Sequence, residues 1–195
     1  MSMKLFILGL LMERDRHPYE IRQTIKERNW NVTFKLRDGS LYYAVDQMRE
    51  DGLIEAAEVI PVPGESRPDK TVYRITEQGK ATLTNLVLEQ LDQQSRPQHP
   101  LFPALLFVRH APPSHVIGLL ERQSAACAAR IEHIRAVLEM KQDLLPRGSR
   151  HMLEGIVAFS ETELRWLESV MADARSGELY TGGRGGKPEN KSTEG

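Results

Sequence analysis

Residues 39–54 read GSLYYAVDQMREDGLI, and this stretch decides the fold. Asp38 or Ser40 can accept a hydrogen bond from a free backbone N–H group where a helix starts. Gly52 suits the left-handed conformation that ends a helix, and apolar residues follow it. One apolar face repeats at helical spacing, through Leu41, Val45 and Met48. The stretch therefore predicts a short amphipathic helix that runs directly into a strand.

The opposite face of this helix is polar and aromatic. It carries Ser40, Tyr43 and Gln47, and Arg37 lies just before the helix. Small polar groups, an aromatic ring and a nearby arginine suit the major groove of DNA. Taken alone, the segment fits an ordinary amphipathic surface helix equally well.

The neighbouring segments extend this helix into a known arrangement. Residues 5–11 predict a buried helix, and Pro18 can open a second helix, where its missing N–H costs nothing. After Gly52, residues 53–60 and 71–75 predict two strands, joined by a Pro- and Gly-rich loop. Three helices followed by a strand, a loop and a strand are the order of a winged helix-turn-helix.

Motifs in the same order carry a family resemblance. In the first half they are LFILGLL at 5–11, HPYEI at 17–21, GSLY at 39–42, EDGLI at 50–54 and YRITEQG at 73–79. These residues resemble the PadR family of bacterial transcription regulators. The second half resembles the long C-terminal region of the family's virulence-activator type, through FPAL at 102–105, the long helix from Ser114 and ELRWL at 163–167. Pro18 departs from the pattern, because the family more often has Gly there.

The predicted fold class is mainly α with a small β-hairpin wing. We expect a winged helix-turn-helix DNA-binding domain over residues 1–94, followed by a linker and a short apolar segment over 95–113. A helical dimerisation domain is expected over 114–178. The last residues, 179–195, are rich in Gly, Lys, Glu and Ser, and this composition predicts a disordered tail.

Two long helices are predicted in the second half, at about 115–145 and 151–175, with Ser114 capping the first and residues 145–152 forming the turn. Apolar or small residues recur in them at heptad spacing. Because such narrow seams favour a partner surface, we expect a homodimer, with an intrachain helical hairpin as the alternative. The predicted interface residues are Ile117, Leu120, Cys127, Ile131, Ile134, Leu138, Leu164 and Leu167.

Composition narrows the function further. The longest apolar run of the 195 residues is far too short for a bilayer, and the N-terminal residues do not resemble a signal peptide. A single cysteine, Cys127, fits the reducing cytoplasm; it is expected to be a buried seam residue, with a thiol switch as the alternative. No catalytic constellation, metal-ligand spacing or cofactor motif emerges from the scattered histidines. The protein is expected not to be an enzyme or a membrane protein.

The predicted partner is double-stranded DNA with a palindromic operator. The net charge of −1 opposes nucleic-acid binding, and residues 1–80 hold as many acidic as basic side chains. We therefore expect a modest electrostatic contribution that depends on dimerisation and salt. The predicted DNA-binding residues are Tyr19, Lys35, Arg37, Ser40, Tyr42, Tyr43, Gln47, Arg67 and Lys70.

The resemblance also implies regulation by a small molecule. Phenolic and other planar ligands bind some members of the family, and apolar clefts between domains are common ligand sites. The candidate effector-pocket residues are Phe102, Phe107, Phe159 and Trp166, although an aromatic on a long helix is more often simple packing. The expected function is a dimeric repressor released by an effector. The alternative is a protein-interaction module that docks partners without reading DNA.

Overall fold

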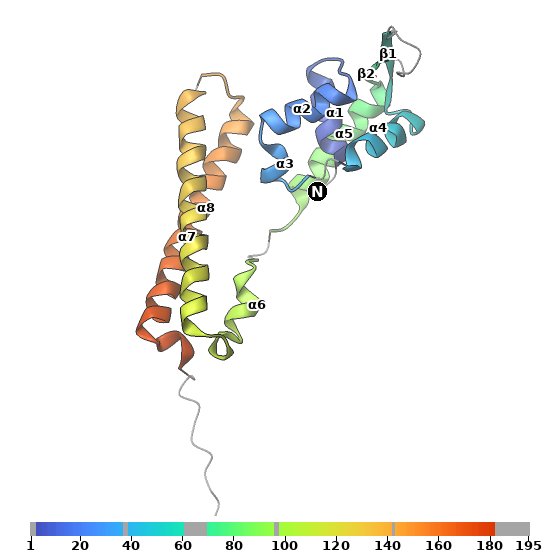
Figure 1. Ribbon diagram of the computed structural model, residues 1–195. Coiled ribbons are helices and arrows are strands. Elements are labelled where there is room, and N and C mark those ends of the chain that lie inside the picture. The colour runs from blue at the N-terminus through green and yellow to red at the C-terminus, as the bar shows by residue number, and fades with distance from the viewer. Residues whose placement is uncertain (1–2, 37–38, 61–69, 96–97, 142, 182–195) are drawn as a thin grey trace, which may run out of the picture. The chain divides into compact units, whose positions relative to one another are not determined.

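The computed structural model describes residues 3–36, 39–60, 70–95, 98–141 and 143–181. The chain divides into two units, Met1–Arg96 and Pro97–Gly195, and each has its own hydrophobic core. Both units are dominated by helices, and the strands form one antiparallel pair (Figure 1). The predicted fold class, mainly α with a small β-hairpin, is confirmed.

The first unit follows the predicted order, with one addition. A short helix that the sequence did not predict, α3, lies between the second helix and the helix that begins at Gly39. The elements are α1 (Met3–Glu13), α2 (Pro18–Glu27), α3 (Trp30–Thr33), α4 (Gly39–Glu50), β1 (Ile54–Ile60), β2 (Lys70–Ile75) and α5 (Glu77–Asp92).

Helix α1 lies at the centre of this unit, as its apolar sequence predicts. Ile7 and Leu8 are 0% exposed, so the helix buries more than one side. The predicted apolar face of α4 is confirmed, because Leu41, Val45 and Met48 are all buried in the same core. Burial of each such side chain stabilises the unit by about 1.5–3 kcal/mol, so this face holds the helix in place.

The helix ends are set by hydrogen bonds that the sequence chemistry anticipates. Pro18 opens α2, and His17 caps it, with Glu20 closing the capping box onto the His17 N–H. Gly52 adopts φ +70°, and its N–H and that of Leu53 bond the carbonyls of Arg49 and Met48. This is the Schellman pattern, and it turns the chain from α4 into β1. Of the two expected caps of α4, Ser40 is wrong because it lies inside the helix, and Asp38 lies outside the described residues.

The wing is a two-stranded antiparallel hairpin with Ile54 opposite Ile75 and a bulge between Ala56 and Glu58. The predicted loop at 61–69 lies outside the described residues. Arg16, between α1 and α2, pairs with Tyr73 through both backbone hydrogen bonds, each 3.0 Å long. Because an isolated two-stranded hairpin is marginally stable, this third backbone contact helps to fix β2.

The second unit is a helical hairpin. Helices α7 (Pro113–Met140) and α8 (Arg147–Ser176) run side by side along their length (Figure 1). The short helix α6 (Leu101–Leu105) and two 3-10 turns, η1 (Val108–His110) and η2 (Glu178–Tyr180), complete the unit. Three predictions about the ends were wrong: Ser114 lies inside α7, α7 ends at Met140, and residues 147–152 belong to α8 and not to the turn.

The heptad seam packs within one chain, so the expectation that it needs a second chain to be buried was wrong. Leu120, Cys127 and Ile131 of α7 lie against Leu167 of α8, and these four are at most 4% exposed. Ile117, Ile134, Leu138 and Leu164 are half-buried. The same heptad spacing fits packing within one chain and packing between two chains. For this reason the sequence left the intrachain hairpin as an alternative.

The hairpin core is not continuous. Among the described residues of 132–159, none is fully buried. Leu153 and Ile156 are half-buried there, and Met140, Leu144 and Phe159 are more than 70% exposed. The half of the hairpin next to the turn therefore leaves an apolar surface, which we call the distal surface. None of the helices in the described ranges combines the length and apolar character that a membrane span requires.

Candidate nucleic-acid interface

The exposed face of α4 is the candidate reading surface. Tyr43 is 72% exposed and Tyr42 47% exposed, and Ser40 is exposed in the first turn. Burial of the opposite face leaves α4 no freedom to rotate, so these side chains are presented from a rigid element. A helix of this length fits the major groove, where hydroxyl and aromatic groups can reach base edges.

Gln47 is less available than the sequence suggests. Its side chain is half-buried, and Nε2 donates to Asp51 Oδ1 over 3.3 Å. Lys4 from α1 makes an ion pair with the other Asp51 oxygen, also at 3.3 Å. Contact with a base would require Gln47 to exchange its Asp51 bond, so Tyr43 is the better exposed of the two.

Two acidic side chains share the exposed face of α4, and neither is among the residues predicted for the site. Asp46 and Glu50 are exposed and four residues apart. A like-charged pair at this spacing destabilises a helix slightly, and both carboxylates repel phosphate. Such a face favours base edges over backbone, since a carboxylate can accept a hydrogen bond from the cytosine amino group.

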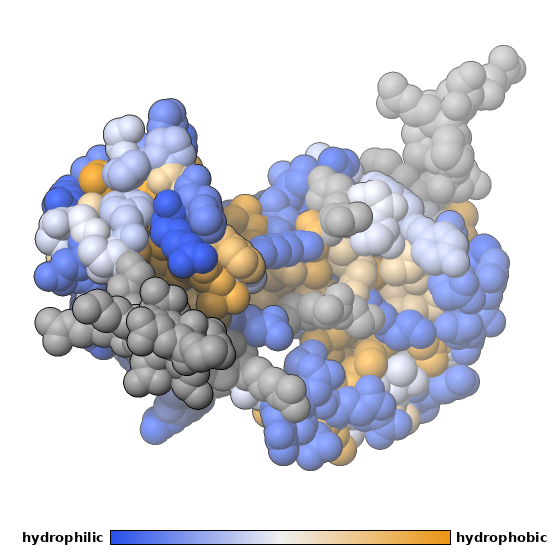
Figure 2. All heavy atoms as spheres, turned by 90° about the horizontal axis from the view of Figure 1, so that it is seen from below, coloured by the Kyte–Doolittle hydropathy of each residue, from blue (hydrophilic) through white to orange (hydrophobic). Residues whose placement is uncertain are grey.

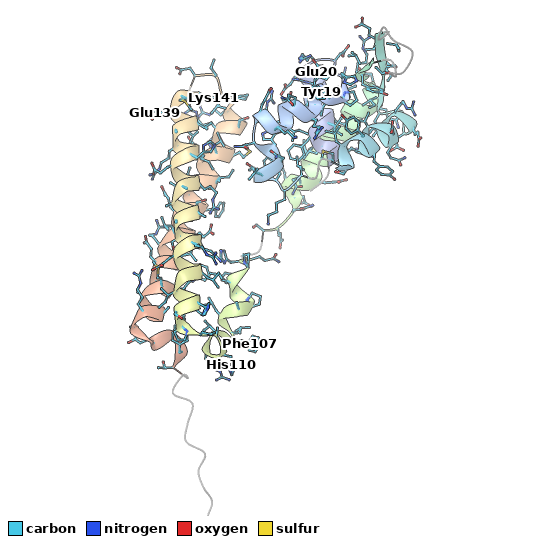
Figure 3. All side chains as sticks on the ribbon, viewed as in Figure 1. Tyr19, Glu20, Phe107, His110, Glu139 and Lys141 are labelled. Atoms are coloured by element: carbon cyan, nitrogen blue, oxygen red, sulfur yellow. The ribbon has the colours of Figure 1, made fainter. Side chains whose placement is uncertain are left out.

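Tyr19 lies in the first turn of α2 and is 56% exposed (Figure 3). Its backbone N–H donates to His17 Nδ1 over 3.1 Å, so the cap fixes the residue that carries the ring. A phenolic hydroxyl beside a helix start is suited to a phosphate oxygen. Tyr19 is thus presented for contact with the DNA backbone.

The predicted basic residues are only partly described. Lys35 is exposed and adopts φ +53°, in the bend that precedes α4. Arg37 and Arg67 lie outside the described residues. Lys70 begins β2, but its side chain is likewise outside the described part of the chain. The structure therefore places one of the four basic side chains, Lys35, next to the reading helix.

A buried arginine joins the elements that carry the interface, and no sequence signal identified it. Arg16 is 6% exposed and donates to the Leu10 carbonyl, to Thr24 Oγ1 and to Glu13 Oε2. Its backbone meanwhile pairs with the wing strand at Tyr73. Arg16 thus ties α1, α2 and β2 together, which fixes the wing relative to the start of α2.

Ion pairs around Arg16 reinforce this connection. Hydrogen bonds from Arg28 hold the pKa of Glu13 below its usual value, against the opposing effect of burial, and Arg16 contributes in the same direction. On the exposed side, Arg74 of β2 donates twice to Asp15 Oδ2, and this bond raises the pKa of the guanidinium. The side chains of Arg16 and Arg74 are therefore already paired with acidic side chains of the protein itself.

The candidate effector residues do not form one group. Phe102 and Trp166 meet edge to face at 5.4 Å, and His99 contacts Trp166 at 4.8 Å, all within the second unit. Phe107 and Phe159 are 67% and 81% exposed. Phe107 lies at the end of the hairpin opposite to Lys141 (Figure 3). Only Phe102 and Trp166 are brought together as predicted.

The remaining polar groups offer little chemistry. Cys127 Sγ donates to the Ser160 carbonyl at 3.2 Å, and burial followed by the charge of Glu163 raises the pKa of the thiol, although Arg130 opposes this. A raised pKa makes the thiol unreactive, which favours the packing role. Among the residues that the structure describes, no group of three His, Cys, Asp or Glu side chains is placed to hold a metal ion.

Comparison with known proteins gives two family matches. The model of the transcriptional regulator PadR-like family matches residues 7–85, and that of the virulence activator alpha C-terminal region matches residues 104–174. A Lysinibacillus sphaericus protein described as uncharacterized is 39% identical over 83 residues, which are 43% of this chain and 72% of that protein.

Solved structures share the fold. Bacillus subtilis PadR in complex with operator DNA superposes with a TM-score of 0.69 at 19% identity, over 88% of this chain and 98% of that chain. Bacillus subtilis PadR in complex with p-coumaric acid superposes with a TM-score of 0.68, at the same identity and coverage. The Vibrio cholerae virulence activator AphA gives 0.64 at 19% identity, over 90% of this chain and 99% of its own.

Proposed function

Because the chain belongs to the PadR-like family of transcriptional regulators, we propose that it is a homodimeric repressor that binds a palindromic operator in double-stranded DNA. It would act in the cytoplasm of a bacterium and leave DNA when a small effector binds. It would carry no cofactor and catalyse no reaction. The observation that carries the proposal is the rigid presentation of Tyr43 and Ser40 on α4, opposite a fully buried face.

In this proposal each protomer places α4 in a major groove. Ser40, Tyr42 and Tyr43 contact base edges, and Tyr19 meets the backbone from the start of α2. Lys35, Arg37, Arg67 and Lys70 supply the phosphate contacts. The net charge of −1 keeps the electrostatic share small, so specificity rests on the groove contacts. A solved relative, Bacillus subtilis PadR, is in complex with operator DNA, which supports this assignment.

The distal surface supports the dimer. Leu120, Cys127, Ile131 and Leu167 are already buried within the chain, so a partner would mainly contact the half-buried and exposed apolar side chains near the turn of the hairpin. Figure 2 views the molecule from the end away from this turn, and hydrophobic side chains lie between hydrophilic ones on the face that it presents. A hairpin whose distal half buries no residue fully gains apolar burial by pairing with a second copy.

The proposed effector is a planar molecule, because Phe102 and Trp166 offer aromatic edges beside His99. A relative solved with p-coumaric acid supports this class of ligand. Such an effector releases DNA only if it binds the DNA-incompetent form more tightly. Phe107 and Phe159 are too exposed to line an enclosed site on their own, and Phe159 belongs to the distal surface.

A protein-interaction module is the second candidate. The exposed acids Asp46 and Glu50 on the reading face and the near-neutral charge favour it. The salt dependence of DNA binding distinguishes these two candidate functions. If α4 and its flanks bind DNA, the affinity for the protein's own upstream region falls steeply as salt rises, because bound phosphates release counterions. Binding that is absent, or insensitive to salt, would favour the protein-interaction module.

Lys35→Ala sharpens this measurement. Each lost phosphate contact is expected to lower the slope of log affinity against log salt by about 0.9, and a symmetric dimer loses two, so the drop is nearly two. The affinities for specific and non-specific DNA should fall equally. The control is Arg122→Ala, an exposed basic residue on the half of α7 away from the turn, which is expected to leave the slope unchanged. Equal slopes for both variants would remove Lys35 from the interface.

Tyr43→Ala tests base reading. Loss of the side chain is expected to cost about 1–3 kcal/mol on the operator and to relax the preference at one position per half-site. Gln47→Ala should cost less, because its amide is engaged with Asp51. Binding to operator and scrambled duplexes is compared by fluorescence anisotropy. An unchanged ratio for Tyr43→Ala would mean that another face of α4 meets the bases.

A further inference from the structure

The two units are joined by a short segment, and its point of attachment to the second unit is built from specific contacts. Helix α5 ends at Asp92, and His99 is half-buried against α8. His99 Nε2 lies 3.2 Å from Glu163 Oε1. The seven-residue step from Asp92 to His99 can span at most about 25 Å, so His99 limits the length of chain between the end of α5 and this attachment.

The hydrogen bonds assign the ring tautomer. The Leu101 N–H donates to His99 Nδ1 over 3.2 Å, so Nδ1 carries no proton. The ring proton is therefore on Nε2, which donates to Glu163. The two nitrogens thus have separate roles, since Nδ1 orients the first turn of α6 and Nε2 fastens the segment to α8.

The receiving carboxylate is itself held in place. Glu163 accepts a bond from Arg130 Nη2 at 2.6 Å, and Arg130 also donates to Ser160 Oγ at 3.0 Å. The Trp166 ring stands edge-on to His99 at 4.8 Å, one turn further along α8. The imidazole is fixed by a carboxylate, an aromatic ring and a backbone N–H, and all three belong to the second unit.

Loss of this attachment would lengthen the free segment. Helix α6 has five residues, too few to be stable alone, and its start depends on His99 through the Leu101 and Phe102 N–H groups. If the bond to Glu163 is lost, the next residue that packs on the core of the unit is Leu101, at the start of α6. The nine-residue step from Asp92 to Leu101 reaches about 32 Å, roughly a quarter more than the original span.

We propose that His99 is a positioning residue for operator recognition: its bond to Glu163 fixes the segment between the units and so restricts the half-site spacing that the dimer accepts. The inference rests on the proposed function, because it concerns two DNA-reading heads in one dimer. A longer tether lowers the effective concentration of the second head by roughly the −3/2 power of its length, about one and a half fold here, and tolerates wrong spacings better.

The test uses two substitutions that separate the nitrogens. In His99→Asn, the amide oxygen can replace Nδ1 toward the Leu101 N–H, but the side chain is too short to reach Glu163. In His99→Gln, the amide N–H can replace Nε2 toward Glu163 and the Nδ1 contact is lost. The matched control is His133→Asn, an exposed histidine on α7. The full-length proteins are compared on duplexes with one half-site, with two half-sites at the selected spacing, and with that spacing changed by about five base pairs, half a helical turn.

We expect wild type, His99→Gln and His133→Asn to prefer the selected spacing equally. His99→Asn should lose about one and a half fold of that preference and keep the wild-type affinity for a single half-site. Glu163→Ala should behave like His99→Asn, and the double variant should lose nothing further.

Three results would overturn the inference: an unchanged spacing preference in His99→Asn, an equal loss in His99→Gln, or a weakened single half-site. Wild type that binds no duplex would instead overturn the proposed function.

Discussion

Replacing Gly79 by alanine is expected to destabilise the first unit by about 3 kcal/mol or more. A Cβ at this position would lie 2.1 Å from the Leu53 carbonyl oxygen and 2.7 Å from Ile75 Cγ1. The backbone cannot withdraw easily, because Thr76 bonds the same Leu53 carbonyl through its N–H and the Gly52 carbonyl through its hydroxyl. Urea unfolding followed by circular dichroism measures the loss.

Gly9→Ala is the matched control for this substitution. Gly9 lies inside α1, and nothing stands within 4 Å of its added Cβ. Alanine in a helix interior is more favourable than glycine by about 0.5–1 kcal/mol, so this variant should be neutral or stabilised. If Gly79→Ala unfolds at the wild-type urea concentration, α5 does not approach Leu53 and Ile75 as closely as described.

The second large effect is expected at the distal surface. Phe159 is 81% exposed, so Phe159→Asp should cost little within one chain, but it places a charge where the partner is proposed to pack. We expect the dimer to dissociate into monomers of 22.2 kDa and the operator affinity to fall by about a hundredfold or more, because one head binds without the other. Sedimentation velocity and anisotropy measure the two quantities.

Two comparisons make that experiment decisive. Ser169→Asp places the same charge on an exposed polar position ten residues further along α8, away from the turn, and it should remain dimeric. Ile131→Asp should instead unfold the hairpin, because Ile131 is 4% exposed within the chain. A wild-type protein that sediments as a monomer, or a Phe159→Asp variant that stays dimeric, would remove the distal surface from the proposed interface.

Local chemistry made most of the first unit predictable. The buried face of α4, the left-handed Gly52 and the first position of α2 at Pro18 depend on neighbouring residues alone, and the structure has all three. A heptad seam, by contrast, indicates that an apolar stripe is covered. It does not indicate which helix covers the stripe. The sequence could not decide between a hairpin and a dimer for Ile131.

The candidate site was harder to predict than the fold. Exposure of Tyr43 and Tyr19 follows from helical periodicity, but the engagement of Gln47 with Asp51 joins a network that reaches Lys4, far away in sequence. Arg16 gave no signal, since a buried arginine and an exposed one look alike in a sequence. His99 also required the fold, because Glu163 is 64 residues away.

The bridge between Arg16 and Tyr73 has a consequence for solubility. An open strand edge is a template for aggregation, because its free N–H and C=O groups can pair with another molecule. Arg16 occupies part of the free edge of β2. The other edge belongs to β1, where Glu55 and Glu58 are exposed. Their charges would face each other in any edge-to-edge stacking of two wings, so each edge of this small sheet carries its own protection against polymerisation.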